Sequence, residues 1–459
     1  MRIELSKPIG LGDLCAAVGV RVPRRAKAVT AITTDSRMAR AGDLFIALGE
    51  GTRYIHDARI RGATTVGESA AADLRCRGES ALLAAAAHYR RNALPRLCEV
   101  VGITGSVGKT TTKEFLTRLL LPHRRVHATV GNRNNQIGLP LTILSAGPDT
   151  ETLVLEMGMN SQGEIAALSR AAAPTVGLIT NIGTAHVGRL GSREAIALAK
   201  LELAAGLSGR LHGPFGEPLI DGRCDVLFTV GEKADTAGRE ICAVGDKQDT
   251  AGRELLSLSY SDGRVGVFKN GRFIGGGDFI SGARHHLVCL AAALSVATEL
   301  VGDRAVEQIA AIGRDAVRER YIEIGELTVV DDSYNASLES VRASLDSLTD
   351  SGIPTRSALL GDILELGALS SDIHAEVGRL AAERLNGEMW LIGEFAVDIA
   401  RGAVLGGFPV SKIHLMHSRE ECADAISARC GREIVLVKGS HACELWRIGE
   451  MIKERRCEG

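Results

Sequence analysis

Hydrophobic runs divide the chain into three blocks. In the first, short β-like runs such as AITTDSR and DLFIAL alternate with turns and lead to an alanine-rich helical segment, SALLAAAAHYRRNA. From Glu99 onward, apolar runs such as EVVGITG, TLVLEMG and TVGLITNIG are separated by helical spans. Runs of this kind are typical of parallel strands buried on both faces. The third block, from about residue 318, repeats this rhythm with LTVVDDS, TRSALLGD, GEMWLIGE and REIVLVKGS.

The alternation of strands and helices predicts an α/β protein. We expect three domains, with boundaries at residues 1–94, 95–317 and 318–459. Residues 206–280 are rich in glycine and charge, which favours an irregular antiparallel excursion within the second domain. The hexapeptide DTAGRE occurs twice there, at 235–240 and 249–254, and no longer period is visible. A local duplication in a surface hairpin explains this repeat, and we assign it no function.

Length, charge and composition argue against several classes of protein. A chain of 459 residues is too long for one compact core. Its net charge of −2 and aromatic content of 3% argue against a partner that is nucleic acid or an anionic membrane. Charged residues interrupt the N-terminal segment, and the longest apolar run, Leu287–Ala297, is too short to span a bilayer. The ten cysteines are scattered without a CxxC pair, so we expect reduced thiols in a cytoplasmic protein.

The stretch GITGSVGKTTTKEF, residues 102–115, predicts a phosphate-binding loop. Its glycines allow a tight turn that aims backbone N–H groups at phosphate oxygens. Lys109 can neutralise the β and γ phosphates, and the Thr110 hydroxyl can hold magnesium. The pattern GxxGxxGKT differs from the usual GxxxxGK[ST], and a strand-to-helix turn without a ligand is the alternative. The residues expected to contact nucleotide are Gly105, Ser106, Val107, Gly108, Lys109, Thr110 and Thr111.

Three further polar residues lie at or after strand ends, where α/β proteins build their sites. Glu156 ends the strand TLVLE, His186 lies in the loop GTAH, and Lys200 lies in the helix IALAKLEL. Each of them, taken alone, is more often structural: a helix cap, a packed histidine or a solvated lysine.

Together with the loop, these residues resemble the Mur ligases, which are ATP-dependent amide-forming enzymes of peptidoglycan assembly. Within this family the similarity is to members that add D-alanyl-D-alanine to UDP-N-acetylmuramoyl-tripeptide. The resemblance extends over nearly the whole chain. The segments that carry it are TTDSRMARAGDLFIAL, GITGSVGKTTTKEF, GNRNNQIGLPLTIL, EMGMNSQGEIAALSRAAAPTVGLITNIGTAHVGRLGS, VVDDSYNASLESV, LLGDILELGALSSDIHAEVG and LVKGS.

The resemblance implies an N-terminal UDP-binding domain, a central ATP-binding domain and a C-terminal Rossmann-like ligase domain. It implies ATP and magnesium as cofactors and an acyl phosphate as the activated carboxylate. Lys109, Thr110 and Thr111 match the site of the ATP phosphates and of one magnesium ion. Glu156 and His186 match ligands of a second magnesium ion, and Lys200 matches a lysine that many members carry as a carbamate, which supplies a negative charge to the metals.

Other residues match family positions that contact the substrate, or that the C-terminal domain brings to ATP. Asp35, Ser36 and Arg37 match the UDP-binding motif. Asn134, Asn135 and Gln136 match the substrate loop. Arg320 and Asp332 match residues of the domain that closes on ATP. The expected partners are therefore a UDP-linked peptide and a dipeptide amine, bound by a monomer.

The sequence departs from the family pattern at the adenine side. The family pattern G-R-H-N-x-x-N corresponds to GARHHLVCLAAA, residues 282–293, where His285 replaces the first asparagine and Val288 the second. The N-terminal block is also trimmed, and the usual N-A-D-D segment is missing near residues 210–226. Two alternatives therefore stay open: an archaeal-type ligase acting on a carboxylated tetrapyrrole or a pseudomurein peptide, and a non-catalytic nucleotide-binding homologue.

Overall fold

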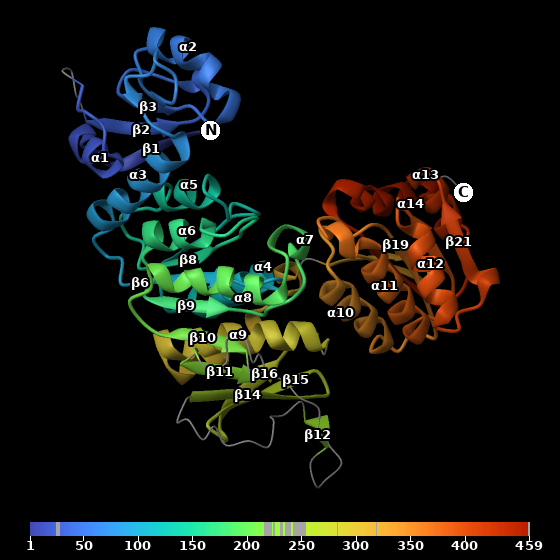
Figure 1. The fold of residues 1–459 in the computed structure, drawn as a ribbon. Coiled ribbons are helices and arrows are strands. Elements are labelled where there is room, and N and C mark those ends of the chain that lie inside the picture. Colours follow the sequence, from blue (N-terminus) through green and yellow to red (C-terminus); the bar gives the residue numbers. More distant parts are fainter. Residues whose placement is uncertain are drawn as a thin grey trace.

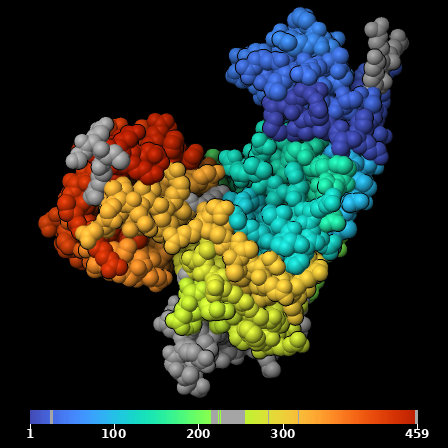
Figure 2. All heavy atoms as spheres, turned by 180° about the vertical axis from the view of Figure 1, so that it is seen from behind, coloured from blue at the N-terminus to red at the C-terminus, as the bar shows by residue number. Residues whose placement is uncertain are grey.

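Three large β-sheets organise the chain, and each forms the centre of one unit (Figure 1). The computed structural model describes residues 1–23, 28–214, 223, 225–229, 233–234, 240–241, 254–281, 283–317 and 319–457. We refer to residues 2–93, 99–316 and 320–457 as the N-terminal, middle and C-terminal units. In both views the N-terminal and C-terminal units lie against the middle unit and apart from each other (Figures 1 and 2). Most of the DTAGRE repeat and of the segment at 210–226, together with residue 318, lies outside the described residues.

The N-terminal unit holds a five-stranded sheet in the order β1-β2-β3-β4-β5. Its elements are β1 (Arg2–Ile9), α1 (Leu11–Val18), β2 (Val29–Thr33), β3 (Asp43–Ile46), α2 (Ile55–Ile60), β4 (Thr64–Gly67), β5 (Leu74–Arg75) and α3 (Gly78–Ala93). The alanine-rich helix α3 joins this unit to the next. Its Tyr89 hydroxyl lies 2.6 Å from Ser6 Oγ on β1 and donates to Ala146 O at 2.9 Å in the middle unit.

The middle unit contains a nine-stranded sheet in the order β16-β15-β14-β11-β10-β9-β6-β8-β7. Its strands are β6 (Glu99–Thr104), β7 (Val126–Ala128), β8 (Thr152–Glu156), β9 (Val176–Ile179), β10 (Leu211–Pro214), β11 (Val226–Thr229), β14 (Glu254–Ser261), β15 (Arg264–Lys269) and β16 (Arg272–Asp278), and a separate pair joins β12 (Lys233–Ala234) to β13 (Glu240–Ile241). Its helices are α4 (Lys109–Leu120), α5 (Gly138–Leu144), α6 (Glu164–Ala172), α7 (Val187–Leu190), α8 (Arg193–Leu201) and α9 (Arg284–Val301).

Helices cover both faces of this sheet, which explains the uninterrupted apolar runs. Successive strand residues point to opposite faces. Val101 and Val154 therefore belong to the core shared with α4 and α9, whereas Val100 and Leu153 belong to the core shared with α5, α6 and α8. Because neither face meets water, both sets of positions are hydrophobic.

The expected antiparallel excursion at 206–280 is only partly present. Strands β14, β15 and β16 pair antiparallel, as predicted. For β10 and β11 the prediction is wrong, because they continue the parallel sheet between β9 and β14. The polar His212 on β10 is fully buried, yet Ser295 and Glu299 of α9 satisfy it at 3.1 and 2.9 Å. Local sequence does not show such a partner, since it lies more than eighty positions away.

Helix α9 contains the longest apolar run of the sequence. Among the described residues, it is the one helix long and apolar enough to cross a membrane by length and composition, but 72% of it is buried inside the protein. It packs along α4 in the core of the middle unit, which accounts for its hydrophobicity.

The C-terminal unit holds a six-stranded sheet in the order β17-β18-β22-β19-β20-β21, with only β17 antiparallel. Its strands are β17 (Arg320–Ile324), β18 (Leu327–Asp331), β19 (Thr355–Leu360), β20 (Met389–Ile392), β21 (Ile413–Met416) and β22 (Glu433–Lys438). Its helices are α10 (Leu338–Thr349), α11 (Ser370–Arg384), α12 (Ala396–Leu405), α13 (Arg419–Ser427) and α14 (Ile448–Cys457). The apolar runs predicted as strands in the middle and C-terminal units form β6, β8, β9, β18, β19, β20 and β22.

Candidate active site

The loop that the sequence predicts to bind phosphate connects β6 to α4. A Cβ at Gly105 would lie 1.9 Å from Thr180 Oγ1, and Gly108 adopts a φ of +79° directly before the helix, so both positions require glycine. The backbone N–H groups of Ser106 and Val107 donate to Asn181 Oδ1 at 3.1 and 2.9 Å. Lys109 folds back over the loop, with Nζ 2.8 Å from Gly105 O. The loop therefore gathers backbone N–H groups and an ammonium group within one turn, where Asn181 and the loop carbonyls accept their hydrogen bonds.

A buried carboxylate lies beside this loop. Glu156 is 1% exposed, and the parallel pairing of β6 with β8 places it opposite Ile103, next to the start of α4. Its Oε2 accepts a hydrogen bond from Thr110 Oγ1 at 2.6 Å, and its Oε1 accepts one from Asn134 Nδ2 at 2.8 Å. Thr110 and Glu156 together offer oxygen atoms of the kind that Mg²⁺ prefers. The residues present therefore fit a magnesium ion at this position.

His186 and Lys200 are two further polar residues of the candidate site. Both line the cavity described below. Burial lowers the pKa of His186, and the charges of Lys200 and Lys109 lower it further. Lys200 is 1% exposed; burial and the charge of Lys109 hold its pKa well below the ordinary lysine value. A desolvated lysine loses its proton readily, and the neutral amine is a nucleophile.

The C-terminal unit completes the cavity, whose volume is about 1020 Å³. Its lining includes the loop from Ser106 to Thr112, the middle-unit residues Asn134, Asn135, Glu156, His186, Lys200 and His285, and the C-terminal residues Asp332, Asn335, Glu339, Glu365 and Lys438. Contacts between the units close one side: Thr184 N donates to Glu339 Oε1 at 2.7 Å, and Arg189 pairs with Glu365 at 2.6 Å.

Two residues of this lining have a clear structural role that the sequence reasoning missed. Glu365 Oε2 lies 2.7 Å from His186 Nδ1. Lys438 is 2% exposed and pairs with Asp332 Oδ2 at 2.8 Å. Both belong to segments already singled out for their resemblance, LLGDILELG and LVKGS, so a signal was present. What the sequence does not show is the contact itself: Glu365 meets His186 across two units, and Lys438 meets Asp332 within the C-terminal unit.

The structure does not bring every predicted residue to the cavity. Arg320 pairs with Asp331 at 2.7 Å on the neighbouring strand and is absent from the described lining, as is Gln136. Asn135 reaches the cavity while its Oδ1 accepts from Gly138 N at 2.9 Å at the start of α5.

The predicted UDP-binding residues lie in the N-terminal unit, away from this lining. Asp35 pairs with Arg37 at 2.8 Å, the arrangement expected of an ordinary surface turn. The Arg37 side chain is 85% exposed, and Ser36 is buried.

Comparison with known proteins agrees with this geometry. Residues 103–211 match the model of the Mur ligase middle domain, and residues 317–441 match that of the Mur ligase glutamate ligase domain. A UDP-N-acetylmuramoyl-tripeptide--D-alanyl-D-alanine ligase of Bacillus subtilis is 33% identical over 76% of this chain and 74% of its own length. The ligase of the same name from Synechocystis is 35% identical over 81% of both chains. The chain therefore belongs to the Mur ligase family.

Solved structures place the fold within this family. A MurF ligase from Thermotoga maritima in complex with ADP superimposes with a TM-score of 0.77 at 28% identity, covering 93% of this chain and 98% of that one. MurF from Acinetobacter baumannii gives a TM-score of 0.80 at 25% identity, covering 98% and 100%. These likenesses confirm the resemblance and the α/β, three-domain fold class inferred from the sequence.

Proposed function

We propose that this chain is an ATP-dependent ligase that adds D-alanyl-D-alanine to UDP-N-acetylmuramoyl-tripeptide in peptidoglycan precursor synthesis. The observation that carries the proposal is the cavity in which the loop residues Lys109 and Thr110 and the buried Glu156 face the C-terminal unit. Relatives with this name, at 33% and 35% identity, support the choice of substrates. Another solved structure, a pseudomurein peptide ligase of Methanothermus fervidus, shares only 16% identity at a TM-score of 0.61, so it supports the fold alone. We therefore do not propose the archaeal alternatives or a non-catalytic role.

A site of this design suits the activation of a carboxylate. A carboxylate repels an amine and has no usable leaving group. In the proposed reaction, a carboxylate oxygen attacks the γ-phosphorus of ATP, the bond to ADP breaks, and an acyl phosphate forms. The amine then attacks the acyl carbon, loses a proton, and expels phosphate. Lys109 offsets charge on the transferring phosphoryl group, and the loop N–H groups position it.

We assign the metal to the oxygen-rich side of the cavity. Thr110, Glu156, His186 and a carbamylated Lys200 would hold magnesium, which supplies positive charge to the phosphates when bound. The lowered pKa of Lys200 supports the carbamate, because carbon dioxide reacts with the neutral amine. His186 suits a ligand role because its lowered pKa favours the neutral imidazole.

The roles of the remaining residues are assigned from the domain in which each of them lies. Residues 1–94 would hold the UDP portion through Ser36 and Arg37, residues 95–317 would bind ATP, and residues 318–459 would close over it with Arg320 and Asp332. Asn134, Asn135 and Gln136 would contact the peptide, and His285 would lie near the base. We expect a cytoplasmic monomer without a nucleic acid or membrane partner.

Isotope transfer tests the reaction directly. The purified protein is incubated with ATP, Mg²⁺, D-alanyl-D-alanine and UDP-N-acetylmuramoyl-tripeptide whose terminal carboxylate carries ¹⁸O. We expect phosphate that contains one ¹⁸O atom, and a product that is heavier than the labelled substrate by the mass of the dipeptide minus that of H₂¹⁸O. Phosphate release that needs neither the peptide nor the dipeptide would overturn the proposal.

A further inference from the structure

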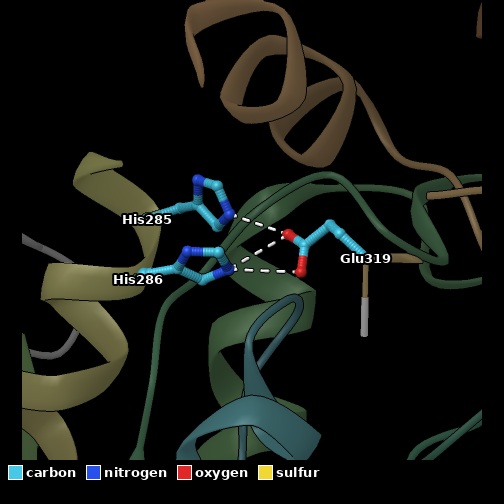
Figure 3. A group of neighbouring side chains, drawn as sticks. All are labelled: His285, His286 and Glu319. Atoms are coloured by element: carbon cyan, nitrogen blue, oxygen red, sulfur yellow. Dashed lines mark hydrogen bonds and ion pairs between the residues drawn. The ribbon is translucent and has the colours of Figure 1, made fainter. Parts of the chain in front are cut away.

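Three side chains with metal-binding atoms meet at the start of α9 (Figure 3). His285 and His286 come from the first turn of this helix, and Glu319 comes from the segment that enters β17. His285 Nε2 lies 2.9 Å from Glu319 Oε1, and His286 Nε2 lies 3.1 and 3.2 Å from the two carboxylate oxygens. Each side chain offers one ligand atom, and these atoms all lie within 4.8 Å of one another.

This spacing suits a tetrahedral ion. With zinc–ligand bonds of about 2.0–2.1 Å, two ligand atoms at a tetrahedral angle are separated by about 3.3 Å. The nitrogen–oxygen separations of 2.9 to 3.2 Å lie close to this value. A small outward movement of the carboxylate would therefore admit an ion among the three.

A second feature is the support behind the histidines. Metal-binding histidines commonly use their other ring nitrogen in a hydrogen bond that fixes the ring. His286 Nδ1 lies 2.9 Å from Ser281 Oγ, so its Nε2 is held toward Glu319. The His286 side chain is 4% exposed and that of Glu319 is 13% exposed, whereas His285 is 27% exposed. The contact with Ser281 thus supports the cluster from within the protein, and His285 lines the cavity on the open side.

The donor atoms indicate which metal the cluster suits, because imidazole nitrogen favours zinc whereas carboxylate and hydroxyl oxygen favour magnesium. The cluster therefore differs from the Thr110–Glu156 pair: it offers two nitrogen atoms and one carboxylate, a donor set suited to zinc rather than magnesium.

We propose that His285, His286 and Glu319 bind a divalent transition-metal ion of the zinc class, at a site separate from the magnesium ligands. Because α9 belongs to the middle unit and Glu319 adjoins the first strand of the C-terminal unit, the bound ion links the two units beside the phosphate-binding loop. The proposal concerns metal binding alone, so it does not depend on the ligase activity or on its substrates.

The test is a metal titration of the full chain without ATP or peptide substrate. The protein is stripped with a chelator and returned to millimolar Mg²⁺, which occupies oxygen-rich sites. Co²⁺ is then added as the spectroscopic probe, and Zn²⁺ binding is followed by calorimetry. For the wild type we expect one tight equivalent with the absorption of tetrahedral Co²⁺. His285→Gln and Glu319→Gln are expected to weaken this binding at least tenfold.

His414→Gln is the matched control. His414 Nε2 lies 2.7 Å from Glu388 Oε2 on the C-terminal sheet, but this pair belongs to no described group of three metal-binding side chains. Its removal should leave the Co²⁺ titration unchanged. Zn²⁺ should also raise the melting temperature of the wild type and of His414→Gln, but not that of His285→Gln.

Two results would overturn the proposal: a wild type without saturable Co²⁺ binding, or a His285→Gln protein with wild-type affinity. Since His285 is the most exposed of the three, its variant is expected to fold even if Glu319→Gln does not.

Discussion

The cavity between the middle and C-terminal units and the Asp35–Arg37 turn hold their polar residues in opposite ways. In the cavity, Glu156 is buried and bonds to Thr110 and Asn134, which are 46 and 22 positions away. In the turn, the exposed Arg37 bonds to Asp35, two positions earlier, and the hydrogen bond from Arg37 lowers the pKa of Asp35 to about 2.

The difference indicates which of the two proposed sites is held in place by the protein's own contacts. An unsatisfied buried polar group costs about 1–3 kcal/mol, so the cavity residues keep one another in place. An exposed ion pair contributes little to stability, and its partners are free to exchange for a ligand. Substitutions in the cavity should therefore affect turnover strongly, whereas substitutions in the turn should affect binding moderately.

The largest effect is expected for Lys109→Ala. Its ammonium group bonds to carbonyls of its own loop and would act on the phosphates, so turnover should fall by at least about 10³-fold. The melting temperature should hardly change, because the side chain is only partly buried. Product formation and thermal unfolding measure the two quantities. Near wild-type turnover would refute the role of the loop.

Lys113, one turn further along α4, is the matched control. It is 1% exposed, and its Nζ donates to Thr129 O at 2.6 Å. Lys113→Met removes a buried hydrogen bond and should lower the free energy of unfolding by about 1–3 kcal/mol. Comparison of the two variants thus distinguishes a lysine whose charge is proposed to act in catalysis from one whose hydrogen bond stabilises the fold.

Lys200→Ala should reduce turnover by about 10²–10³-fold, because the negative charge that the proposed carbamate supplies to the proposed metal site would be lost. A short carboxylic acid such as acetate should restore part of the activity by supplying that charge. The measurement is the rate of product formation with and without acetate. A fully active variant would assign Lys200 a purely structural role.

Glu365→Gln tests the contact between the units. The carboxylate bonds to His186 Nδ1 and pairs with Arg189, so it orients a proposed metal ligand. Loss of such support commonly costs about 10- to 100-fold in activity or metal affinity. We expect Glu365→Gln to need a higher Mg²⁺ concentration than the wild type for half-maximal activity. Glu365→Asp, which keeps the carboxylate, should restore part of the wild-type Mg²⁺ dependence. An unchanged Mg²⁺ dependence would mean that the contact serves only to join the units.

The smallest effect is expected for Arg37→Ala. The binding of UDP-N-acetylmuramoyl-tripeptide, measured by calorimetry, should weaken about tenfold. The melting temperature should stay unchanged because the side chain is 85% exposed. Equal affinity for the variant and the wild type would remove Arg37 from the binding site.

The sequence by itself determined much of the fold and the position of the loop at the centre of the proposed site. Apolar runs predicted β6, β8 and β9, because strands buried on both faces need hydrophobic residues at every position. The loop from Gly105 to Thr111 was predictable since its glycines, lysine and threonines are adjacent in the chain and their chemistry is local.

Only the tertiary structure decided which distant residues meet. The parallel course of β10, the contact of His186 with Glu365 and the approach of Glu319 to His285 and His286 each join segments separated by more than thirty positions. In the sequence, His285 stood only where the family pattern has an asparagine, and its partner Glu319 belonged to no motif. Burial decides such pairings, because a polar side chain removed from water must find a partner wherever the fold supplies one.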